Sequence, residues 1–455
     1  MKPALHRCPL SVVPMLGAGL EAALQINLQR ADLARMQPTG RVTKVAGTSI
    51  EVEGISCSIG SQCTIFCSHG LRSMDAEVIG FSDNRLFLMP YKNVDGLAPG
   101  CKVQPRLSNS LGRLSEAMVG RVLDGFGEPL DGGPVPPYHH YANLNGQIVN
   151  PMQRPPINSI LETGIKAIDT CLTLGRGQRL GLVAGSGVGK SMLLGMMTRF
   201  TEADVIVIGM IGERGREVLD FVHETLGEEG LKRSVVIAAP GDRSPVVRLR
   251  ATHYSCAVAE YFRDQGKNVL LLMDSLTRVA HAQREVGLAV GEPPTTKGYT
   301  PSVFFLINEL VERAGNVSAA GSITGIYTIL AEGDDANDPI VDGARAILDG
   351  HVLLSREIAA MGQYPAIDIS VSVSRLATKL ISGERRALVT KFRRLLATYE
   401  ENKDLVAVGA YRQGTNPELD EALQRRVVFR EFLSQDAEQS VSLEQGFQQL
   451  QSVLG

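Results

Sequence analysis

The 455-residue chain contains no tryptophan, and only 5% of its residues are aromatic. It also has no excess of positive charge, since 46 Lys and Arg face 49 Asp and Glu, a formal net charge of −3. Proteins that bind nucleic acid usually combine a basic surface with aromatic side chains, so this composition argues against nucleic acid as the ligand. A hydrophobic content of 44% with 21% charged residues is ordinary for an α/β enzyme.

Long apolar stretches are also missing. No run reaches the roughly 18 apolar residues that a membrane-spanning helix needs. The first twenty residues place positive charge before an apolar stretch, but Pro9 and Pro14 interrupt it and no clear cleavage site follows. The sequence therefore argues against both a membrane span and a secretory signal.

The seven cysteines are an odd number in a long chain, which favours reduced thiols in a cytosolic protein over a disulfide framework. Cys57, Cys63 and Cys67 cluster, with His69 nearby, so a metal site is one interpretation. The stretch alternates like a strand and no second cysteine pair accompanies it. We therefore expect buried strand thiols there.

The length predicts two to four domains, and changes in hydrophobic pattern and composition divide the chain into four segments. Short alternating stretches between Gly40 and Arg106 predict a small β-barrel or sandwich. Further on, apolar runs alternate with helix-like segments, which predicts a parallel sheet wrapped by helices, with strands at residues 180–184, 205–211, 235–239, 269–273 and 323–330. Charged, helix-prone sequence follows. The predicted segments are 1–36, 37–107, 108–376 and 377–455.

Two further segments lie outside these elements. Residues 120–133, rich in Gly, Pro and Asp, predict a connector and not a helix or strand. Residues 19–36 predict an amphipathic helix. It either packs on the next domain or docks a partner, and we favour protein over lipid as that partner because the helix is neither long nor strongly basic.

The stretch "AGSGVGKS", residues 184–191, resembles a phosphate-binding loop, with Ala184 where the strict pattern has glycine. It follows an apolar run and precedes a helix-like one, so backbone N–H groups and a helix N-terminus can face phosphates. Lys190 can reach the β and γ phosphates, and Ser191 can offer its hydroxyl to Mg²⁺. Alanine is tolerable unless its position needs a positive φ. The expected nucleotide-binding residues are Gly185, Ser186, Gly187, Val188, Gly189, Lys190 and Ser191.

Hydrolysis also needs a metal anchor and a residue that positions water. Asp274 ends a buried-strand run, where a carboxylate can hold Mg²⁺. Glu213 ends the adjacent candidate strand, where a carboxylate can orient or deprotonate the attacking water. The alternatives are a helix cap for Asp274 and a helix-start carboxylate for Glu213.

The motifs "GERGREV", "LLMDSLTR", "GEPPTTKGYTPSVF", "GSITGIYTIL" and "YPAIDISVSVSR" resemble the hexameric ATPases related to the catalytic subunit of rotary ATP synthase. The resemblance covers about residues 40–376. Within that superfamily the chain is similar to the flagellar type III export ATPases in the sequences "LGRGQRLGLVAGSGVGKSMLLGMM" and "RLFLMP". In that family alanine is normal at the first position of the loop. The resemblance implies ATP and Mg²⁺, and a RecA-like P-loop core, α/β in class, between a small N-terminal β-barrel and a C-terminal helical domain.

The resemblance also assigns roles that spacing does not. Arg214 matches an arginine that senses the γ phosphate, and Tyr364 matches a tyrosine that packs against adenine; a core tyrosine is the alternative. Arg375 matches an arginine finger supplied by a neighbouring subunit, with a surface salt bridge as the alternative. A finger acting in trans implies a homohexameric ring with shared active sites.

Partners follow from the same resemblance. It implies a stator-like export regulator at the N-terminal helix, a coiled-coil stalk protein against residues 291–301, export gate membrane proteins, and complexes of chaperone and substrate. Residues 332–339 are acidic, but the acids are not followed by the glycine and distal glutamate of an EF-hand loop, so we expect an interface turn there. The implied location is the cytoplasm, peripherally on the inner membrane at the flagellar base.

The implied function is ATP hydrolysis that energises flagellar protein export by unloading substrates from chaperones. The nearest alternative is the same enzyme in an injectisome. A rotary ATP synthase subunit fits less well, and Glu213 argues against a noncatalytic ring subunit. A Rho-like RNA translocase needs a basic, aromatic β domain, which residues 40–106 do not have.

Overall fold

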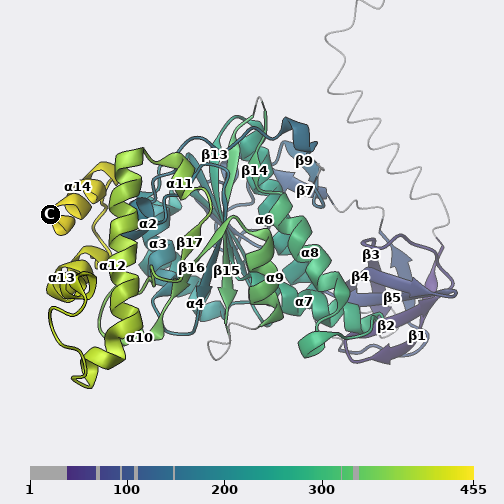
Figure 1. The fold of residues 1–455 in the computed structure, drawn as a ribbon. Coiled ribbons are helices and arrows are strands. Elements are labelled where there is room, and N and C mark those ends of the chain that lie inside the picture. Colours follow the sequence, from purple (N-terminus) through teal and green to yellow (C-terminus); the bar gives the residue numbers. More distant parts are fainter. Residues whose placement is uncertain are drawn as a thin grey trace, which may run out of the picture.

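The computed structural model describes residues 38–67, 72–92, 95–106, 111–146, 149–318, 320–331 and 338–455. A strand barrel, a central sheet covered by helices and a C-terminal set of helices follow one another along the chain, with the barrel and the C-terminal helices at opposite ends (Figure 1). The predicted helix at 19–36 lies outside the described residues, as do residues 332–337 of the predicted interface turn.

The N-terminal part is a closed barrel, which decides between the two expected β architectures. Alternation places side chains such as Ile50, Val52 and Leu88 in the interior, where none has measurable exposure. Closure leaves no unpaired edge strand. In spatial order the strands are β1 (Gly40–Ala46), β2 (Ser49–Glu53), β5 (Arg85–Pro90), β4 (Arg72–Ser82), β3 (Gln62–Cys67) and β6 (Lys102–Pro105).

The clustered cysteines belong to this barrel. Cys63 and Cys67 are buried in β3, as predicted, and Cys57 is half-buried in the loop before it. The described residues contain no group of three or more His, Cys, Asp or Glu side chains placed to hold a metal. The expectation of buried strand thiols is confirmed for Cys63 and Cys67 and is wrong for Cys57.

The central sheet is parallel except for β14 and β17, and all five predicted strands are present in it. Its order, which leaves out β14 beside β15, is β17 (Val373–Ser374), β16 (Gly350–Leu354), β10 (Arg179–Ala184), β15 (Ser322–Leu330), β13 (Asn268–Asp274), β11 (Val205–Ile211), β12 (Ser234–Ala239) and β8 (Arg121–Leu123). The inner strands are buried on both faces, which explains their continuous apolar runs.

The connector predicted at 120–133 is partly wrong. Its first residues form β8, which pairs in parallel with β12 and completes the sheet. Asp131 then binds Arg121, with Oδ2 2.7 Å from Nε, and so fastens the glycine-rich turn back onto the strand. Three residues are too few to display a period, so the strand exists because of its neighbour β12 and not because of a local pattern.

Helices cover both faces of the sheet (Figure 1). On one face lie α2 (Lys166–Cys171), α3 (Lys190–Phe200), α4 (Gly215–Asp220), the π-helical turn Phe221–Leu226 and α5 (Gly227–Leu231). On the other lie α6 (Pro245–Asp264), α7 (Leu276–Ala289), α8 (Pro301–Glu312) and α9 (Pro339–Ile347). The remaining short elements are β7 (Leu111–Leu114), β9 (His140–Asn143), β14 (Gly315–Asn316), α10 (Arg356–Ala360), α11 (Ala377–Leu380), and 3-10 turns at Glu116–Met118, Pro151–Gln153 and Thr296–Gly298.

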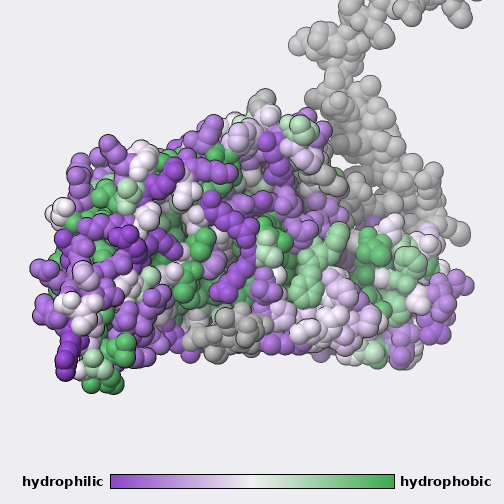
Figure 2. Space-filling model, viewed as in Figure 1, coloured by the Kyte–Doolittle hydropathy of each residue, from purple (hydrophilic) through white to green (hydrophobic). Residues whose placement is uncertain are grey.

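The C-terminal helices are α12 (Gly383–Ala407), α13 (Pro417–Leu433) and α14 (Leu443–Leu454), as the charged sequence predicts. Phe392 packs edge-on against Phe429 and Phe432 between them. Hydrophilic residues dominate the face of this region in Figure 2. In the described part of the chain, no helix has both the length and the apolar character that a membrane crossing requires.

Candidate site of nucleotide hydrolysis

The loop "AGSGVGKS" connects the end of β10 to the start of α3. Gly187 and Gly189 have φ values of 78° and 88°, a left-handed conformation that other residues rarely adopt. Gly189 is the N-cap of α3, so the first N–H groups of that helix open onto the loop. The backbone thus has the form of an anion-binding cradle.

Ala184 does not disturb this cradle. It is the last residue of β10, it is 1% exposed, and it pairs with Leu330 of β15 and Leu354 of β16. Among the described residues only Asp83 and Lys297 combine a side chain with a positive φ. The condition under which alanine is tolerable, a negative φ, is therefore met.

Three charged side chains converge beside the loop. Lys190 Nζ lies 2.5 Å from Asp274 Oδ1 and 3.7 Å from Glu213 Oε1. Asp274 ends β13 and Glu213 follows β11, and these strands are neighbours in the sheet, as expected. The structure thus brings together three residues that lie up to 84 positions apart in the sequence.

Strand β15 separates β10 from β13, and it contributes a residue that the sequence reasoning missed. Thr328 Oγ1 donates a hydrogen bond of 2.6 Å to Asp274 Oδ1, and neither residue is more than 4% exposed. A polar residue in the middle of the buried run "GSITGIYTIL" was the available signal. The sequence could not predict that Thr328 binds Asp274, because only the order of the strands in the sheet places the two residues side by side.

Burial controls the electrostatics of Glu213. Its side chain is 9% exposed, and this burial raises the pKa to about 7, helped by the nearby Asp274 charge and opposed by Lys190. The carboxyl group therefore changes its protonation near neutral pH, the range in which a group that exchanges a proton with water is most useful.

The donor set fits a nucleotide with Mg²⁺. A Cβ on Gly187 would meet no atom within 4 Å, so the space above the loop is open. Among the described residues Glu213 Oε1 has no hydrogen-bond partner despite its burial, which leaves an acceptor for a bound molecule. Ser191 is exposed at the start of α3, and hydroxyl and carboxylate oxygens such as those of Ser191 and Asp274 suit Mg²⁺.

Tyr364 and Arg214, whose roles come from the resemblance, lie differently. Tyr364 is 47% exposed and lies against the loop, since a Cβ on Gly189 would be 3.3 Å from Tyr364 Cδ1. It is thus not the core tyrosine of the alternative interpretation. Arg214 has an 87% exposed side chain that pairs with Glu217 at 3.5 Å, so the structure does not bring it to Lys190.

Arg375 lies at the other end of the sheet. It follows the edge strand β17, whose Ser374 pairs with Gly350, and its N–H donates to Asp349 O at 2.9 Å. Because β16 is parallel to β10, Arg375 lies at the level where β10 begins, whereas the phosphate-binding loop follows the end of β10. Five residues of strand separate these levels by roughly 17 Å. Arg375 is exposed, and its guanidinium donates to Arg345 O at 3.2 Å.

Comparison with known proteins gives three family matches in chain order. Residues 42–106 match the beta-barrel domain of the ATP synthase alpha/beta family, and residues 164–374 match its nucleotide-binding domain. Residues 381–452 match the EscN ATPase C-terminal domain of type III secretion systems.

Similar proteins span almost the whole chain. A flagellum-specific ATP synthase of Pseudomonas aeruginosa is 51% identical over 91% of this chain and 93% of its own. A type 3 secretion system ATPase of Xanthomonas euvesicatoria is 45% identical over 98% and 99%. The structure of assembled EscN, the ATPase of the enteropathogenic E. coli type III secretion system, is 39% identical, with a TM-score of 0.85 over 91% of this chain and 100% of that one. EscN in complex with its central stalk EscO gives a TM-score of 0.82 at 39% identity over the same shares.

Proposed function

The chain belongs to the ATP synthase alpha/beta family and is an ATPase, and from this premise we propose that it energises flagellar type III protein export as a homohexameric ring. The observation that carries the proposal is the convergence of Lys190, Glu213 and Asp274 at a glycine loop built to bind phosphate. These are the parts that phosphoryl transfer to water requires.

Each residue of the cluster has a distinct task in this proposal. Lys190 and the loop N–H groups hold the phosphates, and Glu213 in its carboxylate form orients the attacking water and accepts its proton. Ser191 and Asp274 would hold Mg²⁺, which neutralises charge on the phosphates when bound. Thr328 fixes Asp274 through their hydrogen bond of 2.6 Å. Tyr364 lies where a flat apolar face can support the base.

We propose that Arg375 completes the site of a neighbouring chain. Its position at the opposite end of β10 from its own phosphate-binding loop keeps it from serving that loop, and its exposure leaves it available to another subunit. Arg214, exposed beside Glu213, is proposed to sense the γ phosphate when nucleotide binds.

The flagellar branch is supported by the flagellum-specific relatives of Pseudomonas aeruginosa and of Salmonella typhimurium, the latter 50% identical over 95% of the chain. We propose a coiled-coil stalk as the partner of residues 291–301, by analogy with EscN bound to its central stalk. This loop holds Lys297 at a φ of 52° in a short 3-10 turn, a defined shape for recognition. A regulator at the N-terminal segment, gate proteins, chaperone complexes and a cytoplasmic place at the inner membrane complete the proposal.

An injectisome ATPase is the second candidate, because the Xanthomonas euvesicatoria relative covers 98% of this chain. A deletion strain separates the two. Loss of filaments and motility, restored by the intact gene, supports flagellar export. Normal motility together with lost effector secretion would transfer the function to an injectisome.

Shared active sites are tested by mixing two inactive chains, Arg375→Ala and Glu213→Gln. In a mixed ring, some interfaces combine an intact Glu213 from one chain with an intact Arg375 from the other. With random mixing these are about a quarter of all interfaces, so roughly that share of wild-type ATPase activity should return. No return of activity in rings of normal size contradicts the proposal.

A further inference from the structure

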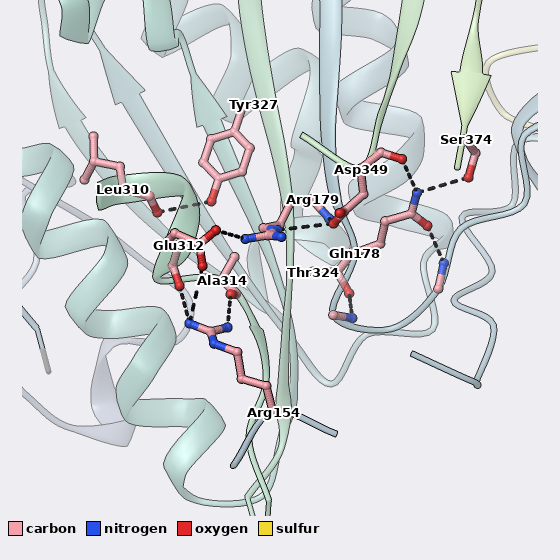
Figure 3. A network of polar contacts seen from close by, with 12 residues as sticks. Arg154, Gln178, Arg179, Leu310, Glu312, Ala314, Thr324, Tyr327, Asp349 and Ser374 are labelled. Carbon is pink, nitrogen blue, oxygen red and sulfur yellow. Dashed lines mark hydrogen bonds and ion pairs between the residues drawn. The ribbon is translucent and has the colours of Figure 1, made fainter. Parts of the chain in front are cut away.

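The strand that carries Arg375 has very little structure of its own. β17 is two residues long, lies at the edge of the sheet, and pairs only with β16 among the described strands. Two ladder positions cannot hold a strand end against thermal motion, because short edge strands are marginal by themselves. The position of Arg375 must therefore depend on other contacts, and Figure 3 shows the polar network around its neighbours Ser374, Gln178 and Asp349.

Gln178 supplies the first contact. It directly precedes β10, has no measurable exposure, and donates from Nε2 to Ser374 Oγ at 3.0 Å. Its Oε1 accepts from Gly175 N at 2.9 Å, which fixes the orientation of the amide. Ser374 Oγ in turn donates to Thr173 O at 3.1 Å. The residue next to Arg375 is thus bound on two sides to the segment before β10.

Asp349 supplies the second contact. Its backbone oxygen accepts the N–H of Arg375, and its carboxylate Oδ2 accepts from Arg179 N at 3.0 Å and Nε at 3.2 Å. Arg179 also donates from Nη1 to Glu312 Oε1 at 2.5 Å, at the end of α8. Arg154 donates to Ala314 O at 2.7 Å just beyond that helix. Asp349 is therefore held from its side chain while its main chain holds Arg375.

Gly350 makes the approach of β17 possible. A Cβ there would lie 2.2 Å from Val373 O and 3.0 Å from Ser374 Cα, so only glycine lets the two backbones meet at this distance. The close approach at Gly350 and the bond from Arg375 N to Asp349 O act on the main chain of residues 373–375, and Gln178 holds the Ser374 side chain between them. In contrast, the guanidinium of Arg375 is exposed, and it donates to Arg345 O at 3.2 Å.

We propose that Gln178 and Asp349 are positioning residues for Arg375, so that a polar network within one chain sets the rate of hydrolysis in the neighbouring chain. This inference rests on the proposed role of Arg375. The physical reason is that an exposed arginine reaches a fixed target only as accurately as its backbone is placed. A misplacement of about 1 Å at a transition-state contact costs on the order of 100-fold in rate.

The test uses Gln178→Leu, which removes the donor to Ser374, and Asp349→Asn, which weakens the pair with Arg179. The matched control is Glu202→Gln, which weakens a comparable carboxylate–arginine pair in the same region, that of Glu202 with Arg176 at 3.2 Å. Ring assembly and melting temperature establish that each chain folds. If Gln178→Leu does not fold, the gentler Asp349→Asn provides the measurement.

In the full-length enzyme we expect each positioning variant to lose roughly 10-fold to 100-fold in kcat while KM for ATP changes little. Mixing either variant with the inactive Glu213→Gln chain should restore activity, because the Glu213→Gln chain supplies a correctly placed Arg375. In an Arg375→Ala background the positioning variants should have no further effect.

The results distinguish the positioning role of Gln178 and Asp349 from the proposed sharing of active sites between chains. If the Arg375→Ala mixture recovers but the Gln178→Leu and Asp349→Asn mixtures do not, the lesion acts within its own chain and the positioning role is wrong. A wild-type kcat in both variants overturns it equally. If even the Arg375→Ala mixture stays inactive, shared sites are wrong, and the positioning role across the interface is overturned with them.

Discussion

The two halves of the proposed active centre are built in opposite ways. Around the phosphate-binding loop, Lys190, Glu213 and Asp274 have largely buried side chains and meet within one chain. At the other end of β10, Arg375 is exposed at the edge of the sheet and donates hydrogen bonds to the backbone oxygens of Asp349 and Arg345. Burial shifts pKa values and fixes geometry, whereas exposure keeps a charge free for a partner. The first half is assembled within one chain, and in the proposed function the second half serves a neighbouring chain.

The largest effect is expected at the exposed half. Arg375→Ala should lower kcat by roughly 10³ to 10⁵, because it removes charge stabilisation in the transition state. Arg375→Lys should recover little, since an ammonium lacks the planar fork of a guanidinium. Steady-state ATPase assays of assembled rings measure this, with Arg426→Ala, an exposed arginine of α13, as the control. A loss below tenfold would place Arg375 outside the chemistry.

At the buried half, Glu213→Gln should lower kcat by roughly 10² to 10⁴ while nucleotide binding persists, since the amide cannot accept a proton from water. Asp220→Asn is the control, because that carboxylate pairs with the exposed Arg216 at 3.4 Å nearby. Binding of labelled ATP and single-turnover hydrolysis measure the two steps separately. Equal losses in both variants would mean that local charge, not Glu213 itself, matters.

Thr328→Val tests whether activity depends on the hydrogen bond from Thr328 to Asp274 in the buried half. Valine keeps the shape of threonine but removes the donor to Asp274, and a hydrogen bond to a charged group is worth about 1.5–3 kcal/mol. We expect roughly a tenfold loss of activity and a higher Mg²⁺ requirement. Thr328→Ser keeps the hydroxyl and should retain most activity. Magnesium titrations of the two variants that coincide would contradict this role.

The pH dependence of activity and stability should come from Glu213 in the buried half and not from Arg375. Burial raises the pKa of Glu213 to about 7, and the carboxylate is the active form, so activity should rise with pH and level off above about 7. The charged form is disfavoured in the folded chain, so Glu213 should also reduce stability as pH rises from the ordinary 4.5 through about 7. Comparing melting curves of the wild type and Glu213→Gln across pH measures this. Parallel curves would exclude the shift.

The smallest effect is expected for Ala184→Gly, which restores the strict loop pattern. Ala184 is a buried strand residue and already has a compatible backbone, so activity should stay within about twofold. Stability should fall by about 0.5–1 kcal/mol, because glycine in a strand loses more conformational entropy on folding. Urea unfolding and ATPase assays measure both. A large gain in activity would show that the methyl group had hindered the loop.

Local signals predicted much of this molecule. The strands β10, β11, β12, β13 and β15 were readable because each is an apolar run bounded by turn residues. The phosphate-binding loop was predictable because the spacing of its glycines lets backbone N–H groups approach a phosphate. In contrast, β8 was missed, because three residues show no period, and Thr328 was missed, because its task depends on the strand order.

The sequence by itself was enough to predict which residues should carry the chemistry. A glycine loop, a lysine and two carboxylates at strand ends indicate phosphate binding and hydrolysis in any protein, because the same groups are needed to bind phosphate and to orient water. Only the tertiary structure decided how they meet: β13 beside β11, β15 between β10 and β13, and Arg375 at the far end of β10. Distances, burial and pKa values arise from packing between segments far apart in the chain, and no local pattern records that packing.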